Sequence, residues 1–138
     1  MIDQKTAPLG AFVLRVSLGS MFVAHSVILK LMVFGLPGTA KFFESLGLPG
    51  FLAYATFAAE AVGGILLILG VQTRLVALAL IPVLLGAAWV HIGNGWVFSA
   101  KGGGWEYPAF LIAASVAVAL LGDGAYALGA TFRRKAVA

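Results

Sequence analysis

The sequence predicts an all-α membrane protein in which four transmembrane helices form an up-down bundle. Of its 138 residues, 62% are hydrophobic and only 10% are charged, whereas an ordinary soluble domain is about 25% charged. The mean hydropathy is +1.05, and a chain this short buries too little surface to hide so much apolar area from water. Four apolar segments follow one another, so we expect one transmembrane domain over residues 1–138.

The first predicted helix covers about residues 9–34 and contains Arg15, His25 and Lys30. Pro8 suits a first helical turn, because proline at that position gives up no helical hydrogen bond. A signal peptide has a shorter apolar region and a cleavage site of small residues. The length of this segment and its arginine therefore favour a retained membrane span.

The second and third predicted helices cover about residues 49–72 and 75–92. The second carries Glu60 near its middle; the third contains Pro82 and ends at His91. The tight turn at 71–74 makes the two helices an antiparallel hairpin. The longer loop before them, residues 35–50, holds a stretch at 39–46 that we expect to form a short amphipathic helix on the membrane surface.

The fourth predicted helix covers about residues 105–121 and begins with Trp105 and Glu106. Trp96, Trp105 and Tyr107 are expected at headgroup level, since tryptophan and tyrosine concentrate at membrane interfaces.

Lysine and arginine are distributed unequally between the two predicted sides. With both termini inside, the inner side has Lys5, Arg74, Arg133, Arg134 and Lys135, and the outer side has Lys41 and Lys101. This bias predicts a multi-pass inner (plasma) membrane protein with both termini cytoplasmic. The basic tail is expected to contact lipid headgroups, and the scattered basic residues argue against nucleic acid as a partner.

Composition and motifs also exclude several kinds of chemistry. The chain has no cysteine, which excludes disulfides, thiol relays and thiolate-held metal clusters in this chain. It has no phosphate-binding loop, dinucleotide fingerprint or c-type haem motif. Redox chemistry would therefore need a bound cofactor.

Glu60 and Arg15 are the candidate catalytic residues. A carboxylate at that depth costs about 2.5–3.5 kcal/mol on insertion scales, so it is rarely kept without a partner or a function. Counted from the inner surface, the two residues differ in height by about 6 Å, which an arginine side chain can span. We therefore expect an Arg15–Glu60 ion pair. Two interpretations stay open: a structural pair between helices, or a proton- or ligand-binding group that Arg15 keeps ionised.

The candidate ligand-binding residues gather at the outer level: His25, Lys30, His91, Glu106 and Trp105. Each histidine could simply be a hydrogen-bonded packing residue. A metal site of His25, His91, Glu60 and Glu106 is conceivable, but no close-spaced ligand pair supports it, and we assign no metal. A quinone or small anion fits better, because histidine and lysine can donate to a quinone oxygen.

Several blocks of the sequence resemble the DoxX family. The first two blocks are Leu14-Arg15-Val16-Ser17-Leu18-Gly19 and Phe43-Glu44-Ser45-Leu46-Gly47-Leu48-Pro49. The next are Glu60-Ala61-Val62-Gly63-Gly64 and the Thr73-Arg74 turn. The last are Gly104-Trp105-Glu106-Tyr107-Pro108 and Gly122-Asp123-Gly124. The resemblance implies a four-helix inner-membrane protein. It also implies a partnership with oxidoreductases, because members of the family look like partners of such enzymes. One is a subunit of a thiosulfate:quinone oxidoreductase in archaea, and another is a membrane component of oxidative-stress complexes in mycobacteria.

These observations lead to one main hypothesis and two alternatives. The main hypothesis is an oxidoreductase subunit in the membrane that binds quinone or a related small molecule between helices, in a polar pocket open to the outer side. It would work with another subunit or a second copy, and whether it is itself an enzyme stays open. The first alternative is a non-catalytic scaffold or chaperone whose charges serve helix packing. The second is a small transporter, which four short spans disfavour.

Overall fold

The computed structural model describes residues 3–129, and all regular structure in that range is helical. The elements are α1 (Ala7–Val23), a π-helix η1 (Ala24–Val33), α2 (Leu36–Ser45), α3 (Phe51–Leu69), α4 (Thr73–His91), a 3₁₀ turn η2 (Ile92–Asn94) and α5 (Glu106–Leu121). The predicted all-α fold is confirmed. The basic tail at Arg133, Arg134 and Lys135 lies outside the described residues.

Three helical stretches are long and apolar enough to cross a membrane: Ala7–Val33, Phe51–Leu69 and Thr73–Asn94. The helix Glu106–Leu121 is apolar but shorter, with 16 residues, or about 24 Å at 1.5 Å per residue. The predicted amphipathic segment in the first long loop forms α2, which lies against α3 and η1. The chain therefore has the helices of a multi-pass membrane protein.

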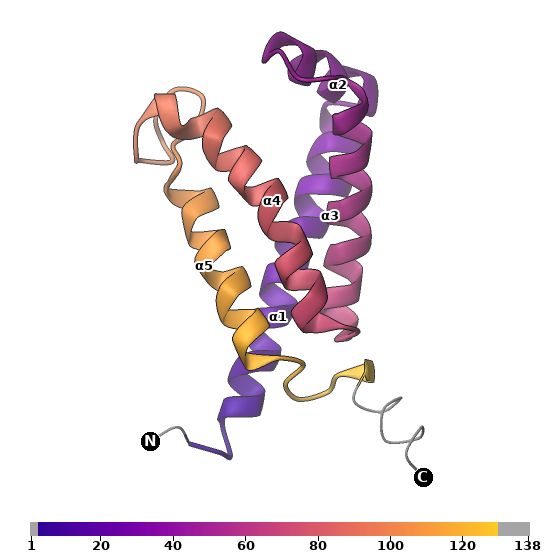
Figure 1. Ribbon diagram of the computed structural model, residues 1–138, viewed down its shortest axis with the longest axis vertical. Helices are drawn as coiled ribbons and strands as arrows, with labels where there is room; N and C mark the ends of the chain where they lie inside the picture. Colours follow the sequence, from indigo (N-terminus) through magenta and orange to yellow (C-terminus); the bar gives the residue numbers. More distant parts are fainter. Residues whose placement is uncertain (1–2, 130–138) are drawn as a thin grey trace.

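The long helices are arranged as two antiparallel pairs. Figure 1 shows α1 beside α3 and α4 beside α5, and these two pairings have the most extensive contacts in the molecule. The pairs converge at the end where the described chain begins and ends, and diverge toward the end that carries α2. The two ends of the bundle consequently have different interiors.

The converging end is filled by the hydrophobic core. All four long helices contribute buried side chains to it, among them Leu18, Leu67, Ala77 and Val118. Beyond this core, the segment that follows α5 is joined to the start of α1, because the amide of Ala125 donates to the Pro8 carbonyl at 2.9 Å. The burial of apolar side chains and this hydrogen bond together fix how the two helix pairs meet.

Two glycines set the register between α1 and α3. A Cβ built on Gly19 would lie 2.7 Å from the carbonyl oxygen of Gly64, and one built on Gly64 would lie 2.8 Å from that of Gly19. Small residues at such a crossing let the two backbones touch. With residue 19 opposite residue 64 in an antiparallel pair, residue 15 lies opposite residue 68, and residue 60 lies opposite residue 23.

Candidate functional site

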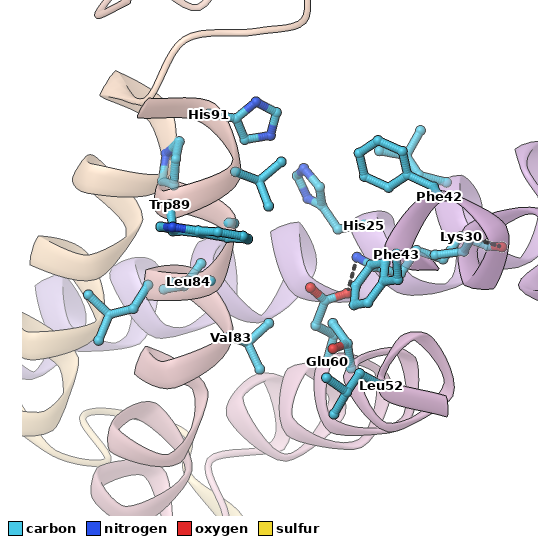
Figure 2. A pocket seen from close by; sticks show the side chains of 18 of the residues that line it. His25, Lys30, Phe42, Phe43, Leu52, Glu60, Val83, Leu84, Trp89 and His91 are labelled. Atoms are coloured by element: carbon cyan, nitrogen blue, oxygen red, sulfur yellow. Dashed lines mark hydrogen bonds and ion pairs between the residues drawn. The ribbon is translucent and has the colours of Figure 1, made fainter. Parts of the chain in front are cut away.

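A large pocket fills the space between the two helix pairs where they diverge. Its volume is about 790 Å³, and it is lined by α1, η1, α2, the first half of α3, and the facing parts of α4 and α5. Four of the predicted site residues line it together: His25, Lys30, Glu60 and His91. Figure 2 shows their side chains around one space, with Lys30 and Glu60 joined by a dashed line.

Glu60 pairs with Lys30. The Nζ of Lys30 donates to Oε2 of Glu60 at 2.6 Å, and the two side chains are 17% and 8% exposed. The expected pairing of Glu60 with Arg15 is therefore wrong. The register explains the error: Arg15 lies opposite residue 68 of α3, eight residues from Glu60, or about 12 Å along the helix.

The π-helical winding of η1 brings Lys30 into the pocket. In an α-helix, residues five apart point about 140° away from one another, since each residue turns by about 100°. A π-helix bonds residue i to residue i+5, as the amide of Phe34 does with the carbonyl of Leu29 at 2.9 Å. His25 and Lys30 are five apart within η1 and therefore share one side of the helix. Both line the pocket.

Arg15 lies at the packed end of the bundle and does not line the pocket. Its side chain is fully buried. It donates to the carbonyls of Leu67 and Ile68, each at 2.6 Å, and to those of Asp123 at 2.9 Å and Ala125 at 3.1 Å. The last carbonyls of a helix have no intrahelical partner, and cations are favourable at that end. Arg15 thus caps α3 and ties the segment after α5 to it.

Both pocket histidines are held through the Nδ1 atom. In His25 this atom lies 2.9 Å from the carbonyl oxygen of Met21, one turn earlier in the same helix. In His91 it lies 3.0 Å from the Gly102 oxygen and 3.2 Å from that of Gly103, in the loop before α5. One imidazole is therefore positioned by its own helix and the other by a loop that folds back over the end of α4.

Tyr107 is a pocket residue that sequence reasoning placed only in the aromatic belt. It lines the pocket, and its ring stacks on that of His25 with centroids 5.7 Å apart. Its hydroxyl is buried and forms no hydrogen bond within residues 3–129. A buried hydroxyl normally has a partner, and the described residues supply none for this one. No sequence signal distinguishes it from other interfacial tyrosines.

Two predicted ligand-binding residues lie outside the pocket lining. The carboxylate of Glu106 accepts a hydrogen bond at 2.6 Å from the amide of Phe98. The Trp105 ring packs edge-on against Trp96 at 4.4 Å. Both residues hold the loop between α4 and α5 in its folded-back shape. Neither residue lines this pocket, and their contact with a ligand stays a prediction.

The rest of the pocket wall is mostly apolar. Val83, Leu84 and Trp89 of α4 face Leu52 of α3 and Phe43 of α2 across the space (Figure 2). An apolar chamber with a few polar groups at fixed positions is the usual form of a small-molecule site, with volumes of about 300–1,000 Å³. Within the described residues, no three histidine or acidic side chains lie close enough to hold a metal ion.

Comparisons with known proteins agree with the resemblance seen in the sequence. The DoxX family matches residues 10–93, which is more than half of the chain. A protein of Bacillus subtilis (strain 168), named "Putative oxidoreductase CatD", is 35% identical over 125 residues, covering 90% of this chain and 87% of that protein. No solved structure matches the chain. With its apolar membrane-length helices, this protein belongs to the DoxX family of membrane proteins.

Proposed function

We propose that this protein is an integral membrane subunit of an oxidoreductase system that binds a quinone or a related small aromatic molecule in the pocket between the helix pairs. One observation carries the proposal. The pocket of about 790 Å³ has apolar walls, yet it places an ion pair and two histidines on its surface. Buried charge is costly in a membrane interior and marks sites of function when it faces a cavity.

The residues present fit a quinone. Its flat ring needs apolar and aromatic walls, which Leu84, Trp89 and Phe43 offer. Its two oxygens need polar groups, and the Tyr107 hydroxyl is a free donor. When bound, a quinone supplies a two-electron, two-proton acceptor. The chain would bind and orient the ring, keep water away from it, and accept a proton at the Glu60 carboxylate, whose negative charge Lys30 balances before the transfer.

The membrane arrangement is part of the proposal. We take α5 as the fourth span, which completes an up-down bundle with α1, α3 and α4. The excess of Lys and Arg near the chain ends supports cytoplasmic termini, and the pocket then opens on the outer half of the membrane. The name of the Bacillus subtilis relative supports an oxidoreductase system. Electrons would be exchanged with another subunit or with a second copy of this chain.

A pocket-filling substitution tests the proposal. Gly86 lines the pocket, and a Cβ built on it meets nothing within 4 Å. Gly86→Phe should therefore fill the pocket without disturbing the helix contacts. Gly10→Phe is the matched control, since Gly10 also has open space at its Cβ but does not line the pocket. We expect the purified protein in lipid nanodiscs to bind 1,4-naphthoquinone, with at least about tenfold loss in Gly86→Phe.

The same experiment separates the scaffold alternative, which the structural role of Arg15 favours. A scaffold predicts no saturable binding of 1,4-naphthoquinone by the wild-type protein. It also predicts that Gly86→Phe behaves like Gly10→Phe in co-purification of any partner protein. Either absence of quinone binding or equal binding by the two variants would overturn the proposed function.

A further inference from the structure

We infer that the pocket prefers the reduced, dihydroxy form of an aromatic ligand to its quinone form. The inference rests on the proposed function, because it concerns the ligand of that same pocket. Its basis is the hydrogen-bonding capacity that the protein leaves unused around the pocket. Three of those free polar groups can only accept a hydrogen bond, and one, the Lys30 ammonium, can only donate.

The first free acceptor belongs to His25. Its Nδ1 lies 2.9 Å from the carbonyl oxygen of Met21, and a carbonyl oxygen only accepts, so Nδ1 must carry the hydrogen. A neutral imidazole has a single N–H, which leaves its other nitrogen as an acceptor. Within residues 3–129, the Nε2 of His25 has no hydrogen-bond partner. In the neutral ring, this contact therefore fixes the tautomer with the hydrogen on Nδ1.

The second free acceptor belongs to His91, and it is fixed independently. Its Nδ1 lies 3.0 Å and 3.2 Å from the carbonyl oxygens of Gly102 and Gly103. The same reasoning places the hydrogen on Nδ1 and leaves Nε2 bare. A different part of the chain, the loop before α5, therefore produces the same tautomer on the facing helix. Both rings line the pocket.

Glu60 adds a third acceptor. Lys30 occupies its Oε2 atom at 2.6 Å, and Oε1 forms no hydrogen bond with the part of the chain that is described. The Lys30 ammonium donates one of its three N–H groups to this carboxylate, and the other two can donate to either form of the ligand. The hydroxyls of Tyr107 and Thr56 can donate or accept. The hydroxyl of Thr39 is engaged with the Gly35 carbonyl at 3.0 Å.

The balance favours a ligand with O–H groups. The two oxygens of a quinone only accept, so they would leave both imidazole nitrogens and the carboxylate oxygen without partners. An aromatic diol, such as a hydroquinone, donates from each hydroxyl to one of these acceptors. A site that hydrogen-bonds a ligand hydroxyl discriminates against the analogue that lacks it, because its polar groups then stay unpaired.

The test compares three ligands that share one ring system. They are 1,4-dihydroxynaphthalene, 1,4-naphthoquinone, and 1,4-dimethoxynaphthalene, which keeps the oxygens but cannot donate. Binding to the full chain in nanodiscs is measured anaerobically by equilibrium dialysis. We expect the diol to bind at least about tenfold more tightly than either of the others. Equal or tighter binding of the quinone overturns this inference and leaves the proposed function standing. Binding of none of the three overturns both.

Two further measurements assign the preference to the histidines. In the variant His25→Phe/His91→Phe, we expect the preference for the diol over the quinone to fall below about threefold, because the diol loses two of its acceptors. A retained tenfold preference would contradict the assignment. Should the variant fail to fold, ¹⁵N NMR of the wild-type histidines decides. We expect neutral rings with the hydrogen on Nδ1 and a shift of both Nε2 resonances on adding the diol; hydrogen on Nε2 in the free protein overturns the inference.

Discussion

At the converging end of the bundle, Arg15 is fully buried and all of its contacts are with the protein itself. At the diverging end, Glu60 is nearly as buried, but its carboxylate borders a pocket of about 790 Å³. Both are charges inside a membrane protein, and the sequence alone suggests one role for the two. Their surroundings separate them. A buried charge whose hydrogen bonds are completed by backbone carbonyls stabilises the fold, whereas one that faces a cavity is available to a ligand.

The largest expected effect follows removal of the charge at the packed end. Arg15→Met leaves four carbonyl contacts without their donor. We expect the free energy of unfolding to fall by about 3–5 kcal/mol, measured by denaturant unfolding in detergent micelles. Arg15→Lys, which keeps a cation at the end of α3, should recover part of the loss. Wild-type stability in Arg15→Met together with selective loss of ligand binding would contradict the structural role.

At the open end, the ion pair predicts a strong coupling. Glu60→Gln or Lys30→Met alone leaves one charge without its partner, and we expect each to lower the free energy of unfolding by about 1–3 kcal/mol, since Lys30 is only partly buried. The double variant should cost less than the sum, with a coupling energy of about 0.5–3 kcal/mol. A parallel cycle of Arg15→Met with Glu60→Gln should be additive, because those residues do not touch. If Glu60→Gln were coupled to Arg15→Met and not to Lys30→Met, the Arg15–Glu60 ion pair expected from the sequence would be correct.

The glycine crossing that separates the two charges predicts a smaller effect. Gly19→Ala places a methyl group 2.7 Å from the Gly64 carbonyl oxygen, and overpacking of this kind costs about 1–3 kcal/mol. Gly10→Ala, in the same helix but with open space, should be neutral or stabilising by up to about 1 kcal/mol. Thermal unfolding of both variants checks the opposite signs. A neutral Gly19→Ala would mean that the two backbones are not in contact.

Glu106→Gln should have the smallest effect. Its carboxylate accepts from the Phe98 amide in an exposed loop, so we expect a loss of stability below about 1 kcal/mol. Affinity for 1,4-naphthoquinone should stay within about twofold of wild type. A tenfold loss of affinity would place Glu106 in the ligand site, as the sequence suggested.

The helices could be predicted from the sequence because their signals are local. The apolar run with Glu60 predicts residues 49–72 and the structure has Phe51–Leu69; the run that ends near His91 predicts 75–92 and the structure has Thr73–His91. The turn between them ends at Gln72, which adopts a left-handed conformation with φ 50°. Composition and segment length are enough for these assignments.

The partners of the charged residues could not be predicted, because they depend on contacts between helices. Heights counted from the membrane surface placed Arg15 and Glu60 about 6 Å apart, but the Gly19–Gly64 contact places them about 12 Å apart, a shift of about one turn. No pattern in the sequence distinguishes the π-helical winding that turns Lys30 toward Glu60. The four pocket residues His25, Lys30, Glu60 and His91 were nevertheless identified by chemistry, since ionisable side chains in apolar helices are rare.

Photoaffinity labelling tests most directly whether the two ends differ in function. The wild-type protein in nanodiscs is irradiated with an azido-substituted 1,4-naphthoquinone, and the labelled peptides are identified by mass spectrometry. We expect labels on pocket residues such as Met21, Trp89 and Tyr107, and we expect unlabelled 1,4-naphthoquinone to compete with them. Labels concentrated around Arg15, or spread over the lipid-facing helix surfaces without competition, would contradict the assignment of the ligand site to the open end of the bundle.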